Sequence, residues 1–391
     1  MKAQVSLLTT GFAIFSMFFG AGNLIYPLEA GITSGNNSLF GMVGFLLTAV
    51  LLPFTGLIAI TLFNGDYYAF FNRLKQPFGS LILFASLMVL GPLVAIPRIV
   101  TLSHTMTAPF LPIAFFQSIT LYSSFVFSIL FLSVTFLVTY RPRKIVEIIG
   151  NIITPALLAS LGIIIIKGLM TAEHMIEATH SPFESFTTNF VRGYETLDLL
   201  GALFFSSILI SMLKDKVLGE NKLQKMASLC LKSGVIGIGL LSLIYVGMNL
   251  LGAFHGHETT ALNTGELFSD LSFAILGSCG AGIIAAAVLL ACLSTAMALS
   301  TTVAAYLQKV VFRDTIAYTT ALIITLVASV PLSTYGLTTV LKLTGGPLVY
   351  VGYPVIIALT FCNILYKTVH FKPVTIPVLL TFFAALISYI W

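Results

Sequence analysis

Long apolar runs separated by short polar segments dominate the pattern along this chain of 391 residues. A helix needs about 20 apolar residues to cross a hydrocarbon layer ~30 Å thick. The runs predict about eleven membrane-spanning helices, at residues 5–26, 40–63, 78–102, 119–138, 145–166, 194–213, 227–254, 281–307, 315–331, 347–366 and 374–391. A further apolar piece, 336–344, is too short to span and is expected to form a short interfacial helix.

The first run is interrupted at its centre by Gly20, Gly22 and Asn23. Each glycine lowers helix propensity by about 1 kcal/mol relative to alanine, and lipid offers no water to bond the asparagine amide. Such a break is stable at membrane depth only where it is buried in protein or lines a polar cavity. We therefore expect residues 20–23 to form the unwound centre of a discontinuous helix, with freed backbone groups facing a binding site.

The sixth run carries a second interruption, at Asp198 and Gly201. If helices 1–5 and 6–10 are equivalent units, the odd number of spans in each unit gives the two units opposite orientations in the membrane. Broken helices at corresponding positions of two inverted halves are typical of secondary transporters with a site at the midplane. We expect one transmembrane domain, with a first repeat at about 5–166, a second at about 193–366 and an extra C-terminal helix at 374–391.

The composition agrees with this interpretation, because 58% of the residues are hydrophobic and 8% are charged, against about 25% charged residues in soluble domains. The mean hydropathy is +1.03. Lys and Arg gather in the even-numbered connections, which places the N-terminus in the cytoplasm and, with eleven spans, the C-terminus outside. These loops also explain the formal charge of +5 without a nucleic-acid partner. We expect a multi-pass protein of the cell (inner) membrane in contact with lipid.

Four ordered stretches resemble signature sequences of the branched-chain amino acid:cation symporter family, the bacterial system II carriers. They are residues 11–27 (GFAIFSMFFGAGNLIYP), 91–98 (GPLVAIPR), 193–205 (GYETLDLLGALFF) and 289–301 (LLACLSTAMALST). The resemblance, which covers helices 1 to 10, implies an all-α leucine-transporter-type 5+5 inverted repeat in the amino acid-polyamine-organocation superfamily. It also implies symport of Leu, Ile or Val with Na⁺ or H⁺, and no cofactor besides this ion. The chain departs from the family in stopping one span short of twelve and in carrying Glu29 at a usually apolar position.

An amino acid substrate brings a carboxylate and an ammonium into a dry cavity, where each group needs fixed partners. The half-helix that begins after Gly20 offers free N–H groups and a positive dipole end to the carboxylate. A purely structural alternative is that the glycines only allow close helix packing. The expected substrate-binding residues are Gly20, Ala21, Gly22, Asn23, Thr196, Leu197, Asp198, Gly201 and Phe204.

Asp198 is the one acid predicted near the centre of a span, and intramembrane acids are candidates for function. It could accept the substrate ammonium, bind the coupling cation or carry a proton. Alternatively, it caps the second half of helix 6 by accepting the Gly201 amide. Phe204 and Phe205 follow this break, and one of them is expected to face the cavity as an apolar wall for a branched side chain; we assign Phe204 to the site.

A cation site is expected beside the first break, because Na⁺ prefers hard oxygen ligands. Helix 8 offers Ala291, Ser294 and Thr295 at i, i+3 and i+4, on one helix face. The resemblance to leucine-transporter-type folds pairs these residues with the carbonyl groups of Ser16 and Phe19 in a Na⁺ site. The spacing alone leaves the alternative that both hydroxyls bond carbonyls of their own helix.

Arg98 is predicted near the outer end of helix 3. It either snorkels to the outer headgroups or belongs to an outer gate in which it pairs with Glu29. His255, His257 and Glu258 lack a fourth ligand and a zinc-type spacing, so we interpret them as a solvated external loop. The four cysteines have unrelated spacings and predict neither a disulfide framework nor a metal site.

The predicted spans contain no paired acids, no Ser/His or Cys/His set and no HExxH motif, which argues against an enzyme. Two broken helices, rather than rings of polar residues, argue against a channel. The sequence thus predicts a carrier that imports branched-chain amino acids with Na⁺, or less readily H⁺, by alternating access. The alternative is a carrier of the same fold for another small neutral amino acid or amphipathic solute.

Overall fold

The computed structural model is all-helical over the residues it describes, which are 6–20, 22–141, 145–178, 180–216, 222–258, 266–277, 280–336, 340, 346 and 348–390. The α-helices of the first half are α1 Leu7–Phe18, α2 Gly22–Ser34, α3 Ser38–Leu46, α4 Leu52–Leu62, α5 Tyr67–Phe71, α6 Phe78–Met88, α7 Ala95–Thr107, α8 Ala114–Gln117, α9 Leu121–Thr139, α10 Ile145–Ile148 and α11 Thr154–Met170. Those of the second half are α12 Pro182–Arg192, α13 Asp198–Lys216, α14 Lys222–His255, α15 Leu267–Leu276, α16 Ala281–Tyr306, α17 Tyr318–Thr334, α19 Tyr353–Val369 and α20 Thr375–Ile390.

Short π-helical turns join or extend several of these helices. They occupy Leu47–Leu51, Val89–Leu93, Ile149–Ile153, Leu307–Val311 and Leu348–Gly352. One of them connects α6 to α7 across Gly91, whose backbone is not helical (φ −96°, ψ −119°), so the third span is kinked there. Short 3₁₀ turns lie at Gly35–Asn37, Ala108–Phe110, Gly193–Thr196 and Gly256–Glu258.

In every run predicted to span the membrane, most of the described residues are helical. Eight helices in the described part of the chain are long and apolar enough to cross a membrane, and α1, α15, α17 and α20 are shorter apolar helices. The first span is broken as predicted, since α1 ends at Phe18 and α2 begins at Gly22. Helix α15 was not predicted, and the expected interfacial helix at 336–344 lies almost entirely outside the described residues.

The sixth span begins earlier than its apolar run indicates. Its first half is α12 with the 3₁₀ turn Gly193–Thr196, and its second half is α13. The predicted start at Tyr194 was therefore wrong. Residues 182–192 (PFESFTTNFVR) are too polar to read as a membrane segment, although one face of α12 is buried against α3.

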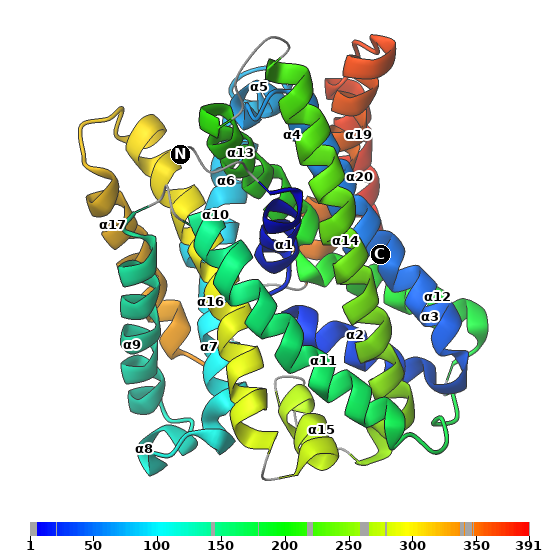
Figure 1. The fold of residues 1–391 in the computed structure, drawn as a ribbon. Coiled ribbons are helices and arrows are strands. Elements are labelled where there is room, and N and C mark those ends of the chain that lie inside the picture. Colours follow the sequence, from blue (N-terminus) through cyan, green and yellow to red (C-terminus); the bar gives the residue numbers. More distant parts are fainter. Residues whose placement is uncertain are drawn as a thin grey trace.

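The two broken helices pack in a reciprocal way. The most extensive contacts between described helices join both halves of the first span, α1 and α2, to α14, and both halves of the sixth span, α12 and α13, to α3 and α4. The first span thus packs on the seventh (α14), and the sixth span packs on the second (α3 and α4). Each broken helix therefore contacts the second helix of the other repeat, as expected for two inverted five-helix repeats. Figure 1 shows α1 near the centre of the bundle, between α14 and α16.

Glycines make these close approaches possible on both sides. A side chain at Gly252 of α14 would collide with the carbonyl of Leu28 on α2, and one at Gly44 of α3 would collide with the carbonyl of Phe186 on α12. In lipid the hydrophobic effect does not favour association of helices, so close van der Waals packing does, and small residues at the interface allow the backbones to approach. Glycines thus serve close helix packing at these contacts, away from Gly20 and Gly22 of the first break.

Replacement of Gly252 by alanine is expected to lower the stability of the fold by about 1–3 kcal/mol, as overpacking does. The matched control is Gly239→Ala on the same helix, where an added Cβ has nothing within 4 Å. Both changes have the same effect on helix propensity, so any difference reports the contact with α2. Thermal unfolding of the two purified variants in detergent measures it, and equal melting temperatures would contradict this account of the packing.

The connections that differ in charge lie at opposite ends of the bundle. Figure 1 shows α5, in a connection predicted to be cytoplasmic, at one end, and α8 and α15, in connections predicted to be external, at the other. The helix order therefore agrees with the alternation of charge along the sequence. Which end faces the cytoplasm stays a prediction of the positive-inside rule.

Candidate functional site

The two breaks have different local geometries. At the first, Phe19 is extended (φ −82°, ψ 90°), and the Gly20 N–H bonds the Phe18 carbonyl at 3.1 Å. At the second, Leu197 is left-handed (φ 61°) between the 3₁₀ turn and α13. Left-handed backbone is unfavourable for a side chain as large as leucine, and such strain gathers at functional sites.

Asn23 forms hydrogen bonds within the first break and links this break to the second. Its Oδ1 accepts the Gly20 N–H at 3.3 Å, while its own N–H bonds the Gly20 carbonyl at 3.1 Å. Its Nδ2 donates to Asp198 Oδ2 at 2.7 Å and also contacts the hydroxyl of Tyr245. The Tyr245 hydroxyl in turn donates to Asp198 Oδ2 at 3.2 Å. One carboxylate therefore holds the two unwound segments to each other and to helix α14.

Asp198 does not cap its own helix through the Gly201 amide. That amide bonds the Leu197 carbonyl at 3.0 Å, so the capping alternative was wrong. The amide of Leu199, which directly follows Asp198, donates to the Tyr353 hydroxyl of α19 at 2.9 Å. The Asp198 side chain, 7% exposed, is left to face the partners from α2 and α14 and the cavity between the breaks.

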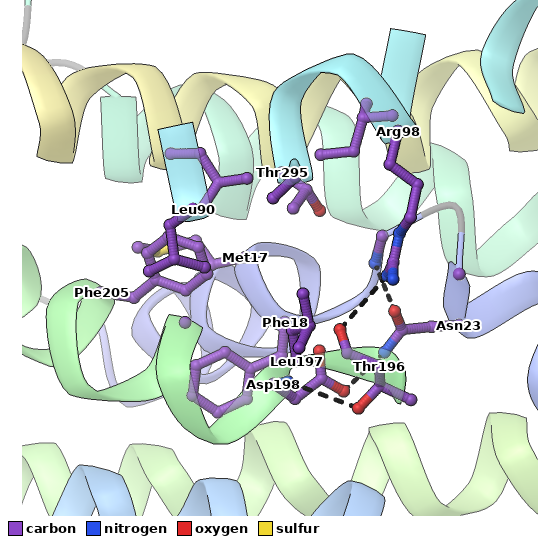
Figure 2. A pocket seen from close by; sticks show the side chains of 16 residues that line it. Met17, Phe18, Asn23, Leu90, Arg98, Thr196, Leu197, Asp198, Phe205 and Thr295 are labelled. Carbon is purple, nitrogen blue, oxygen red and sulfur yellow. Dashed lines mark hydrogen bonds between the residues drawn. The ribbon is translucent and has the colours of Figure 1, made fainter. Parts of the chain in front are cut away.

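A small cavity of about 40 Å³ lies between the two breaks. It is lined by Met17, Phe18, Gly20, Gly22, Asn23, Leu90, Ala95, Arg98, Ile99, Thr196, Leu197, Asp198, Gly201, Phe205, Thr295 and Leu299. Figure 2 shows Arg98, Asn23, Thr196 and Asp198 gathered on one side, and Leu90, Met17 and Phe205 on the other. One end of the cavity is thus polar and the other apolar.

Most of the predicted substrate-site residues line this cavity. They are Gly20, Gly22, Asn23, Thr196, Leu197, Asp198 and Gly201, whereas Ala21 lies outside the described residues. Phe204 does not line it. That ring is fully buried and packs on Phe71 and Tyr67, and Phe205 lines the cavity in its place.

Arg98 lies in the cavity wall, which neither sequence interpretation anticipated. It is 5% exposed, so it does not snorkel to the headgroups, and it does not pair with Glu29. Glu29 bonds Arg192 of α12 at 2.9 Å instead, while Arg98 donates to the carbonyl of Glu195 at 2.7 Å. The sequence contained Arg98 in the GPLVAIPR stretch, but gave no sign that the kinked third span would bring it to the breaks.

The predicted cation ligands come together next to this cavity. Ser294 Oγ donates to the carbonyl oxygens of Ser16 and Ala291, both at 3.0 Å, and Thr295 Oγ1 donates to the carbonyl of Phe19 at 3.2 Å. The Thr295 hydroxyl therefore bonds the break and not its own helix. The five predicted cation-site residues thus form two hydrogen-bonded groups at the junction of α1 and α16, one around the Ser294 hydroxyl and one between Thr295 and Phe19.

The Ser16 hydroxyl adds a further polar atom at this junction. It is buried and has no hydrogen-bond partner in the structure. An unsatisfied buried hydroxyl costs about 1–3 kcal/mol, and the cost is offset where a ligand supplies the partner. Neutral oxygens of this kind suit a monovalent hard cation, which makes the junction chemically suited to Na⁺.

In the part of the chain that the structure describes, the histidines and cysteines do not form a second site. His255 is buried and its Nε2 lies 2.8 Å from the Gly168 carbonyl, so the interpretation as a solvated loop was wrong for this residue, whereas His257 is exposed. Within the described residues, no group of three His, Cys, Asp or Glu side chains could hold a metal ion. Cys230, Cys292 and Cys362 are free and buried.

Two solved structures resemble this chain along nearly its whole length. One is Mhp1, a nucleobase-cation-symport-1 family transporter, in a closed conformation with bromovinylhydantoin bound (TM-score 0.60, 15% identity, covering 100% of this chain and 92% of the other). The other is a substrate-bound, outward-open Na⁺-coupled sialic acid symporter (TM-score 0.61, 10% identity, 99% and 89%). At these identities the similarity establishes the fold, which is the leucine-transporter-type inverted repeat.

Sequence relatives identify the family. The branched-chain amino acid permease BraB of Bacillus subtilis (strain 168) is 32% identical over 364 residues, which are 91% of this chain and 80% of the relative. The profile of the family described as "Branched-chain amino acid transport protein" matches residues 3–390. The relatives are transporters and not enzymes. The chain therefore belongs to the branched-chain amino acid transport protein family, as the resemblance of its signature stretches implied.

Proposed function

We propose that this protein imports branched-chain amino acids together with Na⁺, as a secondary active symporter in the cell membrane with its N-terminus in the cytoplasm. The substrate class follows from the family and agrees with the cavity. Its polar end, with Asp198 and Arg98, suits the charged groups of an amino acid, and its apolar end, with Leu90, Met17 and Phe205, suits a branched aliphatic side chain.

The observation that carries the cation coupling is the meeting of helices α1 and α16. Carbonyls freed at the first break lie 3.0 and 3.2 Å from the hydroxyls of Ser294 and Thr295. A Na⁺ ion bound by these oxygens would replace the two hydrogen bonds that now join the helices. Because Thr295 also lines the substrate cavity, ion and substrate would act on the same broken helix.

Alternating access follows from the position of the breaks. The half-helices α2 and α12 lie on the predicted outer side of the cavity and are joined by the Glu29–Arg192 ion pair, while α1 and α13 lie on the inner side. Movement of either pair about the breaks would open one side of the cavity. A secondary transporter needs such movement around a fixed site.

Uptake of radiolabelled leucine into proteoliposomes tests this function. Accumulation should require an inward Na⁺ gradient, fail when choline replaces Na⁺, and persist with a protonophore. Accumulation driven only by a proton gradient would reject Na⁺ coupling and assign the coupling role to Asp198. No leucine uptake under either gradient would reject the substrate while leaving the fold in place.

Shortening Phe205 is expected to change which substrates are accepted. In Phe205→Leu the apolar end of the cavity is larger, so the preference for leucine over phenylalanine should fall about tenfold, the size of effect that side-chain fit provides. The matched control is Phe204→Leu, which alters packing on Phe71 but not the cavity. Competition by both amino acids for labelled leucine measures the preference. An equal fall in both variants would mean that the Phe205 ring does not set selectivity.

A further inference from the structure

Arg98 is a buried cation without a carboxylate partner. The ion pair found among the described residues joins Arg192 to Glu29, and Arg98 bonds only backbone carbonyls, those of Glu195 at 2.7 Å and Thr196 at 3.4 Å. These bonds occupy part of the donor set of a guanidinium. A buried charge is costly unless it is paired. Arg98 therefore has both the charge and the spare donors to bind an anion in the cavity.

The guanidinium lies against the first break. A Cβ added to Gly22 would come within 2.6 Å of Arg98 Nη2, so the absence of a side chain at Gly22 lets the cation rest on the first residue of α2. The N–H groups at the start of a helix lack partners within the helix and carry its positive dipole end. Two independent features that attract an anion thus meet at the same place.

An opposite charge lines the same cavity. Asp198 is 7% exposed and accepts hydrogen bonds from Asn23 and Tyr245, both uncharged. It forms no ion pair among the described residues. Figure 2 shows Asp198 and Arg98 on the polar side of the cavity, with Thr196 between them. The cavity therefore presents one acid and one base that form no direct ion pair with each other.

We propose that Arg98 binds the carboxylate of the transported amino acid while Asp198 binds its ammonium, so that the site selects the zwitterion. This inference rests on the proposed function and deepens it. Each residue meets one charge of the ligand, and the backbone N–H groups at the start of α2 assist Arg98. The site then discriminates against a compound with the leucine side chain that lacks the carboxylate. Because Arg98 also holds the carbonyls before the second break, the substrate carboxylate links α7 to both broken helices.

The test compares leucine with leucinamide, which keeps the ammonium and the side chain but has no carboxylate. Inhibition constants against labelled leucine are measured for the full-length protein in proteoliposomes, and dissociation constants are measured calorimetrically on purified protein. The wild type should bind leucine about 100-fold more tightly than leucinamide. In Arg98→Gln, the affinity for leucine should fall about 100-fold, as when one member of a buried charge pair is removed. The affinity for leucinamide should change less than about threefold.

Two further variants keep the result interpretable. Arg98→Lys retains the positive charge but not the forked geometry of the guanidinium, and should preserve part of the preference for leucine. Arg192→Gln removes an arginine that is outside the cavity and bonded to Glu29, and should leave the ratio of the two constants unchanged. If Arg98→Gln lowers the affinities for leucine and leucinamide equally, Arg98 only stabilises the backbone through its hydrogen bonds, and the inference is overturned. If the wild type binds no leucine, the proposed function itself fails.

Discussion

Asp198→Asn is expected to reduce leucine uptake by about 100-fold or more, since loss of one charge from a buried pair costs ~2–5 kcal/mol. The substitution preserves size but removes the negative charge that faces the ammonium. It also turns an acceptor into a group that can present an N–H to the Nδ2 of Asn23, which now donates to Asp198 at 2.7 Å. Initial uptake rates measured over a range of leucine and Na⁺ concentrations give the effect.

The matched control for this change is Asp66→Asn. Asp66 caps helix α5 by accepting the Ala69 N–H at 2.9 Å, and asparagine is as good an N-cap as aspartate. This variant should therefore transport like the wild type. Full activity of Asp198→Asn, with unchanged dependence on the cation, would show that the Asp198 carboxylate serves only to join the two breaks.

The parts of the site that the sequence revealed are those encoded in backbone preference and helical spacing. Two glycines and an amide close together in an apolar run favour a break, and a break at membrane depth must be buried in protein or line a polar cavity; this located the first break. Spacing of i, i+3 and i+4 put Ser294 and Thr295 on one face of α16, and the hydrogen bonds to Ser16 and Phe19 place that face against the break. These inferences needed no knowledge of how distant helices pack.

The parts that sequence reasoning missed depend on packing between helices. Phe204 and Phe205 are consecutive, so composition cannot decide which ring faces the cavity; the answer is set by the aromatic cluster with Phe71 that covers Phe204. Arg98 lines the cavity from α7, which follows the kink of the third span at Gly91, a backbone feature without a hydropathy signal. Helix α12 was overlooked because its polar residues resemble a loop when only apolar length is counted.

Removal of either hydroxyl from the α16 face is expected to raise the half-saturating Na⁺ concentration about tenfold, which corresponds to ~1.4 kcal/mol for one lost ligand. The variants are Ser294→Ala and Thr295→Ala. Matched controls are Ser300→Ala and Thr302→Ala on the same helix, because these buried hydroxyls bond carbonyls of their own helix, those of Met297 and Ala298. Leucine uptake at a series of Na⁺ concentrations, with ionic strength held constant by choline, gives the half-saturating value for each protein.

The same series shows whether ion and substrate are coupled through the first break. Coupling between two binding equilibria is reciprocal, so the ion-site variants should have weakened leucine affinity at low Na⁺ and recover it as Na⁺ approaches saturation. Thr295 touches both sites, since its hydroxyl bonds Phe19 and its side chain lines the cavity, and Thr295→Ala should therefore recover less completely than Ser294→Ala. Unchanged Na⁺ responses in both variants would remove the cation from this junction, and the coupling would then have to be carried by the Asp198 carboxylate.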